Sequence, residues 1–161
     1  MSRPTYTGVS ALAGSAENMK CITVQQPWAT LAAAGLTKYI LRDWRTSHRG
    51  PMAIQASRQF PRQNVELCCD EEMRGLLRGA GCDYVIQLPV HAVIGTVTLC
   101  DCIYVTTNNR GMFQADDPAV HFGVLQPGRW AWICSDARPF PKPIPMTGRL
   151  GVFKIPDDIG R

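Results

Sequence analysis

The sequence predicts an α+β fold in which a small barrel or a strongly curved β-sheet carries helices on its outside. Three observations favour this class: the strand-like segments are short, two helical patterns lie early in the chain, and no regular βαβ alternation occurs. The 161 residues suit one domain with a single core. Because 45% of the residues are hydrophobic and only 19% are charged, a disordered chain and a coiled coil are excluded.

The first helix is predicted to lie between short strands. Residues Lys20–Val24 predict a strand, and the helix begins around Pro27, a residue type that favours the first helical position, and ends at Gly35. Tyr39–Trp44 is predicted to be extended and to lead through a polar turn into a strand at Pro51–Ala56. Because the helix is short and rich in alanine, packing against other elements must stabilise it.

A longer helix and the strongest strand pattern follow. Apolar residues at helical spacing predict a helix over Gln63–Gly79. Val90–Thr106 is rich in Val, Ile and Thr and predicts a strand that Gly95 bends, whereas Thr107–Gln126 is predicted to be a long loop. The last expected elements are strands at Arg129–Ser135 and Leu150–Ile155, with an extended segment over Pro139–Pro145 that cannot be a central strand.

The positive charge is concentrated in one segment. The formal net charge is +4, yet Lys38–Arg62 alone contains six basic residues against one acid, Asp43. Arginine outnumbers lysine 13 to 4, and a guanidinium can grip phosphate through two hydrogen bonds and stack on bases. This cluster predicts a polyanionic partner, of which nucleic acid is the commonest; the alternative is a solvated face without a ligand.

The cysteines and histidines form neither a disulfide framework nor a metal site. The seven cysteines are odd in number, include the adjacent Cys68 and Cys69, and contain no C-x-x-C pair. The three histidines lie far from one another along the chain. We therefore expect no metal and no cofactor, and a reducing compartment, which is the cytoplasm or, in a eukaryote, the nucleus.

Residues 1–18 are small and polar, without a continuous apolar stretch. We expect them to form a disordered arm rather than a signal peptide, followed by a folded domain over residues 19–157. No stretch of the chain reaches the ~20 apolar residues that a membrane helix needs. We therefore expect no membrane partner, and we also expect a monomer.

Separated motifs occur in a defined order along the chain. The motifs are Gln26-Pro27-Trp28-Ala29, Gly35, Arg42, Trp44, Thr46, Arg49-Gly50-Pro51 and Ala56-Ser57, then Ile94-Gly95-Thr96-Val97, Asp101-Cys102, Gly128-Arg129-Trp130-Ala131-Trp132, Pro143-Ile144-Pro145 and Gly148. With them, residues 20–155 resemble the ASCH domain family of the PUA-like superfamily. The resemblance implies an α+β fold, a small PUA-like β-barrel with two or three helices packed outside. It also implies a cleft lined by the segment around Arg42, and RNA or DNA binding as the family's main role.

Two positions depart from the family pattern, because Thr37 stands where the family has Lys and Ile40 where it has Glu. Some small relatives hydrolyse N4-acetylcytidine with that Lys, a Thr at the position of Ile40 and a distant Glu. The resemblance therefore leaves a hydrolase of modified nucleosides, or a weak ribonuclease that uses His48 or Lys38, as an alternative. A second alternative is a protein-interaction module of a transcription coactivator complex, which would have protein partners.

Ten residues are expected to contact nucleic acid. Arg42, Arg45, His48 and Arg49 frame a turn after Trp44. Their side chains would grip phosphates or base edges while the Trp44 ring stacks on a base. The other five candidates are Gln26, Trp28, Lys38, Ser57 and Arg58.

Several of these candidates also have a structural interpretation. Arg42 can pair with a neighbouring acid or with a backbone carbonyl instead of a ligand. Trp44 and Trp28 can belong to the core, and Gln26 can cap the first helix. Each of these alternatives stays open at the level of the sequence.

We expect no catalytic residue in the chain. Ser57 lacks the neighbouring base that a nucleophile needs. An isolated histidine in a turn, such as His48, is more often simply exposed than a general acid or base. The sequence thus predicts a module that binds nucleic acid, RNA first, rather than an enzyme.

Overall fold

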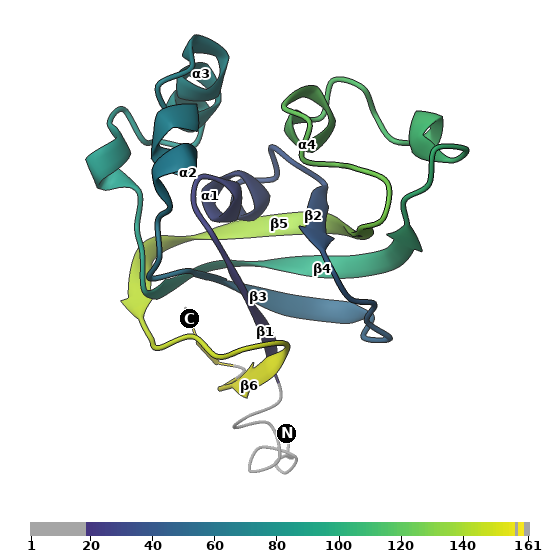
Figure 1. Cartoon of the computed structure of the whole chain (residues 1–161). Coiled ribbons are helices and arrows are strands. Elements are labelled where there is room, and N and C mark those ends of the chain that lie inside the picture. The colour runs from purple at the N-terminus through teal and green to yellow at the C-terminus, as the bar shows by residue number, and fades with distance from the viewer. Residues whose placement is uncertain (1–18, 157, 160–161) are drawn as a thin grey trace, which may run out of the picture.

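The computed structural model describes residues 19–156 and 158–159, so the expected N-terminal arm lies outside the described residues. Figure 1 shows one sheet with short helices above it in that view. The strands are β1 (Met19–Val24), β2 (Tyr39–Arg42), β3 (Gly50–Ala56), β4 (Ala92–Tyr104), β5 (Trp130–Pro145) and β6 (Phe153–Ile155). The helices are α1 (Trp28–Ala33), α2 (Arg62–Leu67), α3 (Glu71–Gly79) and α4 (Pro118–His121), with 3₁₀ turns at Val85–Gln87 and Arg110–Met112.

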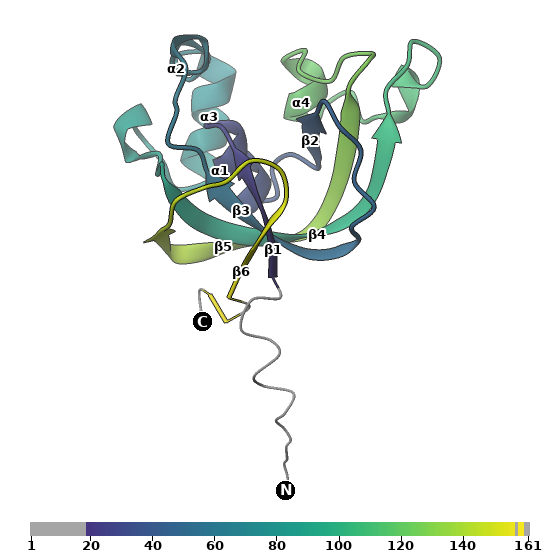
Figure 2. The ribbon, with the colours of Figure 1, turned by 60° about the horizontal axis from the view of Figure 1, so that its bottom comes forward.

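The six strands form one mixed sheet in the order β2-β5-β4-β3-β1-β6. Strands β1 and β3 run parallel, and the other neighbouring strands run antiparallel. The long strands β4 and β5 bend along their length, so that the sheet curls around α1 (Figure 2). These features confirm the predicted α+β class with a barrel-like sheet, which among the described residues is curled but not closed by pairing of its edge strands β2 and β6.

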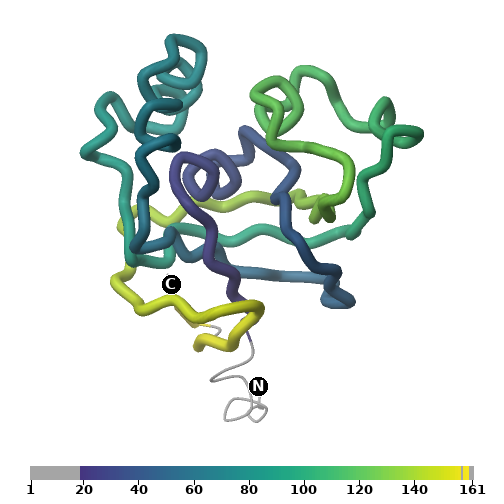
Figure 3. Tube along the Cα trace, in the orientation of Figure 1, coloured from purple at the N-terminus to yellow at the C-terminus, as the bar shows by residue number. Residues whose placement is uncertain are grey.

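The centre of the core lies between α1 and the sheet. Ala29, Ala32 and Ala33 on α1 are buried in one cluster with Ile54 of β3 and Trp132 of β5. Small side chains on the helix bring its axis close to the strands, and the buried contacts stabilise a helix too short to form alone. The trace in Figure 3 shows how the chain passes from β1 through α1 into β2 beside this core.

Gly95 permits this close packing. A Cβ atom at Gly95 would lie 2.7 Å from the carbonyl oxygen of Arg138 and 3.0 Å from the Cβ atom of Ala33. The register of β4 against β5 also shifts between Val93 and Gly95. The predicted bend of this strand at Gly95 is therefore confirmed.

The prediction of a single helix over Gln63–Gly79 is wrong, because the structure has two helices there, α2 and α3. The break falls at Asp70, whose backbone is extended and whose carboxylate accepts hydrogen bonds from two N–H groups in the first turn of α3. Aspartate is a preferred N-cap, so its local hydrogen bonds start a new helix where the apolar spacing predicts a continuous one.

The long loop expected over Thr107–Gln126 is also corrected, since it contains a 3₁₀ turn and the short helix α4. Asp117 caps α4, with its carboxylate accepting from the N–H of Ala119, and Pro118 occupies the first helical position. An aspartate followed by proline is a strong start signal for a helix, even when only one turn follows.

The proline-rich segment Pro139–Pro145 is extended, as predicted, and forms the second part of β5. Strand β2 pairs only with residues from Trp130 to Ile133 of β5. Beyond that point β5 pairs with β4 alone, so the prolines lie at a sheet edge, where a missing N–H donor is tolerated. None of the helices in the part of the chain that the structure describes could cross a membrane.

Candidate functional site

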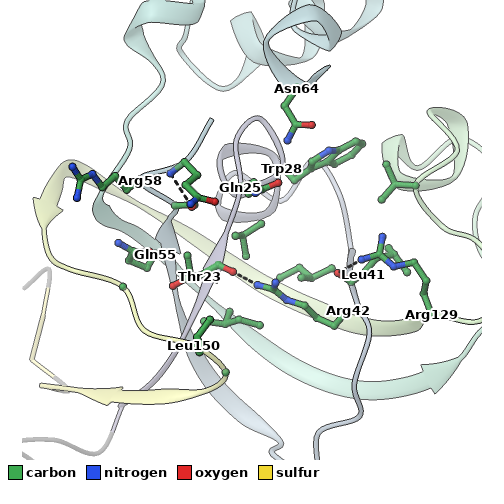
Figure 4. Close-up of a pocket in the computed structure, with 18 of the residues that line it drawn as sticks. Thr23, Gln25, Trp28, Leu41, Arg42, Gln55, Arg58, Asn64, Arg129 and Leu150 are labelled. Atoms are coloured by element: carbon green, nitrogen blue, oxygen red, sulfur yellow. Dashed lines mark hydrogen bonds between the residues drawn. The ribbon is translucent and has the colours of Figure 1, made fainter. Parts of the chain in front are cut away.

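A pocket of about 940 Å³ opens beside the sheet. Its walls come from β1, β2, β3, α1, α2, the segment after α4 and the loop between β5 and β6. Figure 4 shows Thr23 and Arg42 near its centre, with Trp28 and Asn64 above them and Leu150 below in that view. A volume of this size is typical of pockets that bind a small molecule or a nucleotide.

The pocket wall is positively charged. Among the described residues that line it, four are arginines and none is an aspartate or a glutamate. The arginines are Arg42, Arg58, Arg129 and Arg149. A concave wall with cations and without acids attracts anions and concentrates them near the protein.

Arg42 on β2 carries the most buried of these charges. Its guanidinium donates a hydrogen bond to the carbonyl oxygen of Thr23, and its Nε atom is buried without a partner. Burial, assisted by the nearby charge of Arg129 and opposed by Asp43, lowers the pKa of Arg42 to about 10. The guanidinium therefore stays protonated at neutral pH, with hydrogen-bonding capacity left for a ligand.

Arg129 supplies a second cation beside Arg42. It immediately precedes β5, and its neighbour Trp130 pairs with Arg42 across the β2–β5 ladder. The Nε atom of Arg129 donates to Oδ1 of Asp43 at 3.3 Å, and a terminal nitrogen donates to the carbonyl of Leu41 at 3.4 Å. Asp43 is largely exposed, so solvent screens this ion pair and a ligand can compete for the guanidinium.

Gln55 and His91 bring further polar groups to the same pocket. Gln55 is fully buried, and its Nε2 donates to the carbonyl of Met146 at 2.7 Å, which leaves Oε1 without a partner. The Nδ1 atom of His91 is also buried and unpartnered, on a backbone with a φ of 57°. Because such groups are costly to bury alone, they are suited to recognise donors and acceptors of a bound molecule.

Five of the ten expected site residues line the pocket, namely Trp28, Arg42, Trp44, Ser57 and Arg58. Trp28 is partly buried, touches three hydrophobic clusters and lies edge-on to Phe122, with ring centroids 6.5 Å apart. Trp44 is 40% exposed and lies edge-on to Trp132, with centroids 6.0 Å apart. The two tryptophans thus combine packing contacts with a position at the pocket.

Gln26 lies outside the pocket and is fully buried. Its side-chain oxygen accepts from the N–H of Thr30 at 3.0 Å, and its amide nitrogen donates to the carbonyl of Pro89 at 2.7 Å. Gln26 therefore caps the first turn of α1 and ties it to the segment before β4.

The remaining four expected residues also lie away from the pocket lining. The Arg49 guanidinium pairs with Asp101 at 3.5 Å, and Nε2 of His48 lies 3.0 Å from the carbonyl of Pro51. Arg45 and Lys38 are exposed. The structure thus separates the residues expected to bind nucleic acid together. Arg42 and Trp44 line the pocket, whereas the turn that follows them lies outside its lining.

The two positions that depart from the family pattern have different surroundings. Ile40 is buried and lines the pocket with hydrocarbon. Thr37 is buried outside the pocket lining, where its hydroxyl donates to Asp117 at 2.6 Å. Neither side chain offers an amine, a carboxylate or a free nucleophile to a ligand in the pocket.

The pocket residues Gln55, His91, Arg129 and Arg149 were not among the site residues expected from the sequence. Gln55 had a usable signal, since it is a polar residue inside an otherwise apolar strand. His91 and Arg129 had none, because each stands just before a strand and reaches the pocket only through long-range strand pairing.

Comparisons with known proteins agree with this fold. No family model matches the chain. The fold is similar to that of ASCH from Zymomonas mobilis, with a TM-score of 0.52 and 13% identity over 87% of this chain and 89% of that one. In sequence, activating signal cointegrator 1 of Mus musculus and that of Homo sapiens are each 27% identical over 141 residues.

The sequence similarity and the similar fold confirm the expected resemblance to ASCH domains. The match to activating signal cointegrator 1 covers 86% of this chain. The chain spans about 22% of the length of these relatives.

Proposed function

We propose that this chain is an RNA-binding ASCH domain that takes a nucleotide into the pocket beside Arg42. The observation that carries the proposal is the buried guanidinium of Arg42, with an unpartnered Nε, in a pocket whose described lining contains four arginines and no acid. A phosphate would supply the missing acceptors and the opposite charge, and charge-assisted hydrogen bonds of this kind are the strong ones.

The other pocket groups support a nucleotide over a simple anion. Trp28 and Trp44 present indole surface at the pocket, and stacking of a base on an aromatic ring contributes about 1–3 kcal/mol. Gln55 and His91 offer unpartnered polar atoms that can read a base edge. Arg42 and Arg129 would contact the phosphate, while these groups hold the base.

The side chains that line the pocket favour binding of a nucleotide over its hydrolysis. Within residues 19–156 and 158–159, no carboxylate and no cysteine lines it. The Ser57 hydroxyl already accepts a hydrogen bond from the N–H of Gln59 at 3.0 Å. Without the Lys and Glu or Thr of the hydrolase pattern, the pocket is suited to hold a nucleotide rather than to cleave one.

A binding titration tests the proposal. Fluorescence anisotropy with a labelled single-stranded RNA of about 12 nucleotides should give a saturable curve, and Arg42→Met should weaken it about tenfold. Arg110→Met is the matched control, because Arg110 is exposed and lies outside the pocket lining. Equal affinities for Arg42→Met and the wild type would contradict the proposal, and a DNA of the same sequence measures the preference for RNA.

A further inference from the structure

We infer that Leu150 is a wedge that fills the gap left in a base stack when a nucleotide leaves the stack and enters the pocket. The inference rests on the proposed function and makes it more specific. It names the ligand as a nucleotide from a paired or stacked region of RNA rather than from a fully open strand.

The exposure of Leu150 is the first observation. Its side chain is 99% exposed, the highest value among the large hydrophobic residues of the described chain. Ile86 is 93% exposed but lies outside the pocket lining, whereas Leu150 belongs to it. A single exposed leucine is ordinary on a surface, so its place at the mouth of an arginine-lined pocket is what distinguishes Leu150.

The loop that carries Leu150 is anchored to the pocket wall on one side. The carbonyl of Met146 accepts from Gln55 Nε2 at 2.7 Å, and the carbonyl of Arg149 lies 3.5 Å from its donor, the Thr23 hydroxyl. Between these two points, a Cβ atom at Gly148 would lie 2.6 Å from Gln55 Oε1 and 2.7 Å from Thr23 Oγ1. The backbone thus lies directly against β1 and β3 and presents the Leu150 side chain outward.

The chemistry of the neighbours fits a wedge. Apolar side chains such as leucine insert between bases in several nucleic-acid-binding proteins, and the insertion offsets part of the unstacking cost of a few kcal/mol. Arg149 is exposed next to Leu150 and can contact the phosphate beside the inserted side chain. The pocket of about 940 Å³ lies immediately behind the loop and can receive the displaced nucleotide.

An RNA hairpin with 2-aminopurine in its stem tests the inference, because the fluorescence of this base rises when it leaves the stack. The wild type should bind the hairpin with a rise in fluorescence. Leu150→Ala should abolish the rise and should weaken hairpin binding about tenfold more than it weakens binding of a single-stranded RNA. Ile86→Ala is the matched control and should behave like the wild type.

Two outcomes would overturn the wedge. One is an unchanged fluorescence rise and hairpin affinity in Leu150→Ala; the other is a wild type that binds single-stranded RNA but leaves the 2-aminopurine stacked. In both cases the proposed function survives, because RNA is still bound. Failure of the wild type to bind either RNA would instead contradict the proposed function itself.

Discussion

The hydroxyl of Thr37 donates a 2.6 Å hydrogen bond to Oδ1 of Asp117, which lies 80 residues further along the chain. The same carboxylate accepts from the backbone N–H groups of Lys38 at 2.8 Å and Ala119 at 2.9 Å. Asp117 therefore joins the start of β2 to the N-terminus of α4. Thr37, at the position where the resemblance places a lysine, is thus engaged in a contact outside the pocket lining.

Asp117→Ala should destabilise the fold. The substitution removes the N-cap of α4 and leaves the buried Thr37 hydroxyl without its closest partner, at a combined cost of about 2–4 kcal/mol. Thermal unfolding should shift down by about 5–10 °C. The neighbouring Asp116 is exposed, so Asp116→Ala is the control and should leave the midpoint nearly unchanged. Equal midpoints for the two variants would show that the Asp117 contacts are not stabilising.

Arg42→Met should lower the affinity for RNA without lowering the stability of the fold. Burial lowers the pKa of Arg42, which means that the fold disfavours the charged guanidinium relative to the unfolded chain. Replacing it with an apolar side chain of similar length should therefore leave the unfolding midpoint unchanged or raise it, although RNA affinity falls. A clearly lowered midpoint would identify Arg42 as a structural residue and remove the support that it gives to the proposed function.

Two buried thiols predict a loss of stability at alkaline pH. Burial raises the pKa of Cys21 and of Cys134 from 9.0 to about 12. Since the unfolded chain then loses these protons before the folded protein does, their contribution to stability is full below pH 9 and falls as pH rises towards 12. Each thiol contributes a slope of about 1.4 kcal/mol per pH unit in that window. Urea unfolding at several pH values should show that the free energy of unfolding falls less steeply with pH in Cys134→Ala than in the wild type. Equal slopes in the two proteins would contradict a raised pKa for the Cys134 thiol.

Incubation with N4-acetylcytidine and with labelled RNA should give no product. Ile40 lines the pocket as hydrocarbon, and Thr37 is hydrogen-bonded to Asp117, so the groups that the resemblance implies for a hydrolase are missing from these two positions. Liquid chromatography of the nucleoside and a gel of the RNA provide the readouts. Turnover that is abolished by His48→Ala or Lys38→Ala would contradict the binding account and favour the enzyme.

Much of the fold could be predicted from local patterns. The strand at Met19–Val24, the helix that follows Pro27 and the bend at Gly95 depend on hydrophobic runs and on residues with special backbone preferences. The break at Asp70 could not be predicted from periodicity, because apolar spacing continues across it while the capping bonds decide the structure locally. The N-cap Asp117 likewise sets the start of α4, in a segment whose polar composition predicts only a loop.

The site was predicted less completely than the fold. A cluster of arginines in the sequence indicates an anionic partner, but it does not show which guanidinium groups converge. Arg42 reaches the pocket and Arg49 pairs with Asp101, although both belong to the same basic segment. Arg129 and His91 join Arg42 only because strands distant in sequence pair in the sheet, and a single sequence carries no direct signal of such pairing.

The salt dependence of RNA binding shows whether the pocket arginines contact phosphate. Anisotropy titrations of single-stranded RNA should be run between about 50 and 300 mM KCl, where each phosphate contact contributes a slope of about −0.7 to log affinity against log salt. With two or three contacts from Arg42, Arg129 and Arg149, the predicted slope is about −1.4 to −2.1, and Arg42→Met should make it shallower by about 0.7. An affinity that does not change with salt, or a slope that is the same in Arg42→Met, would contradict the account.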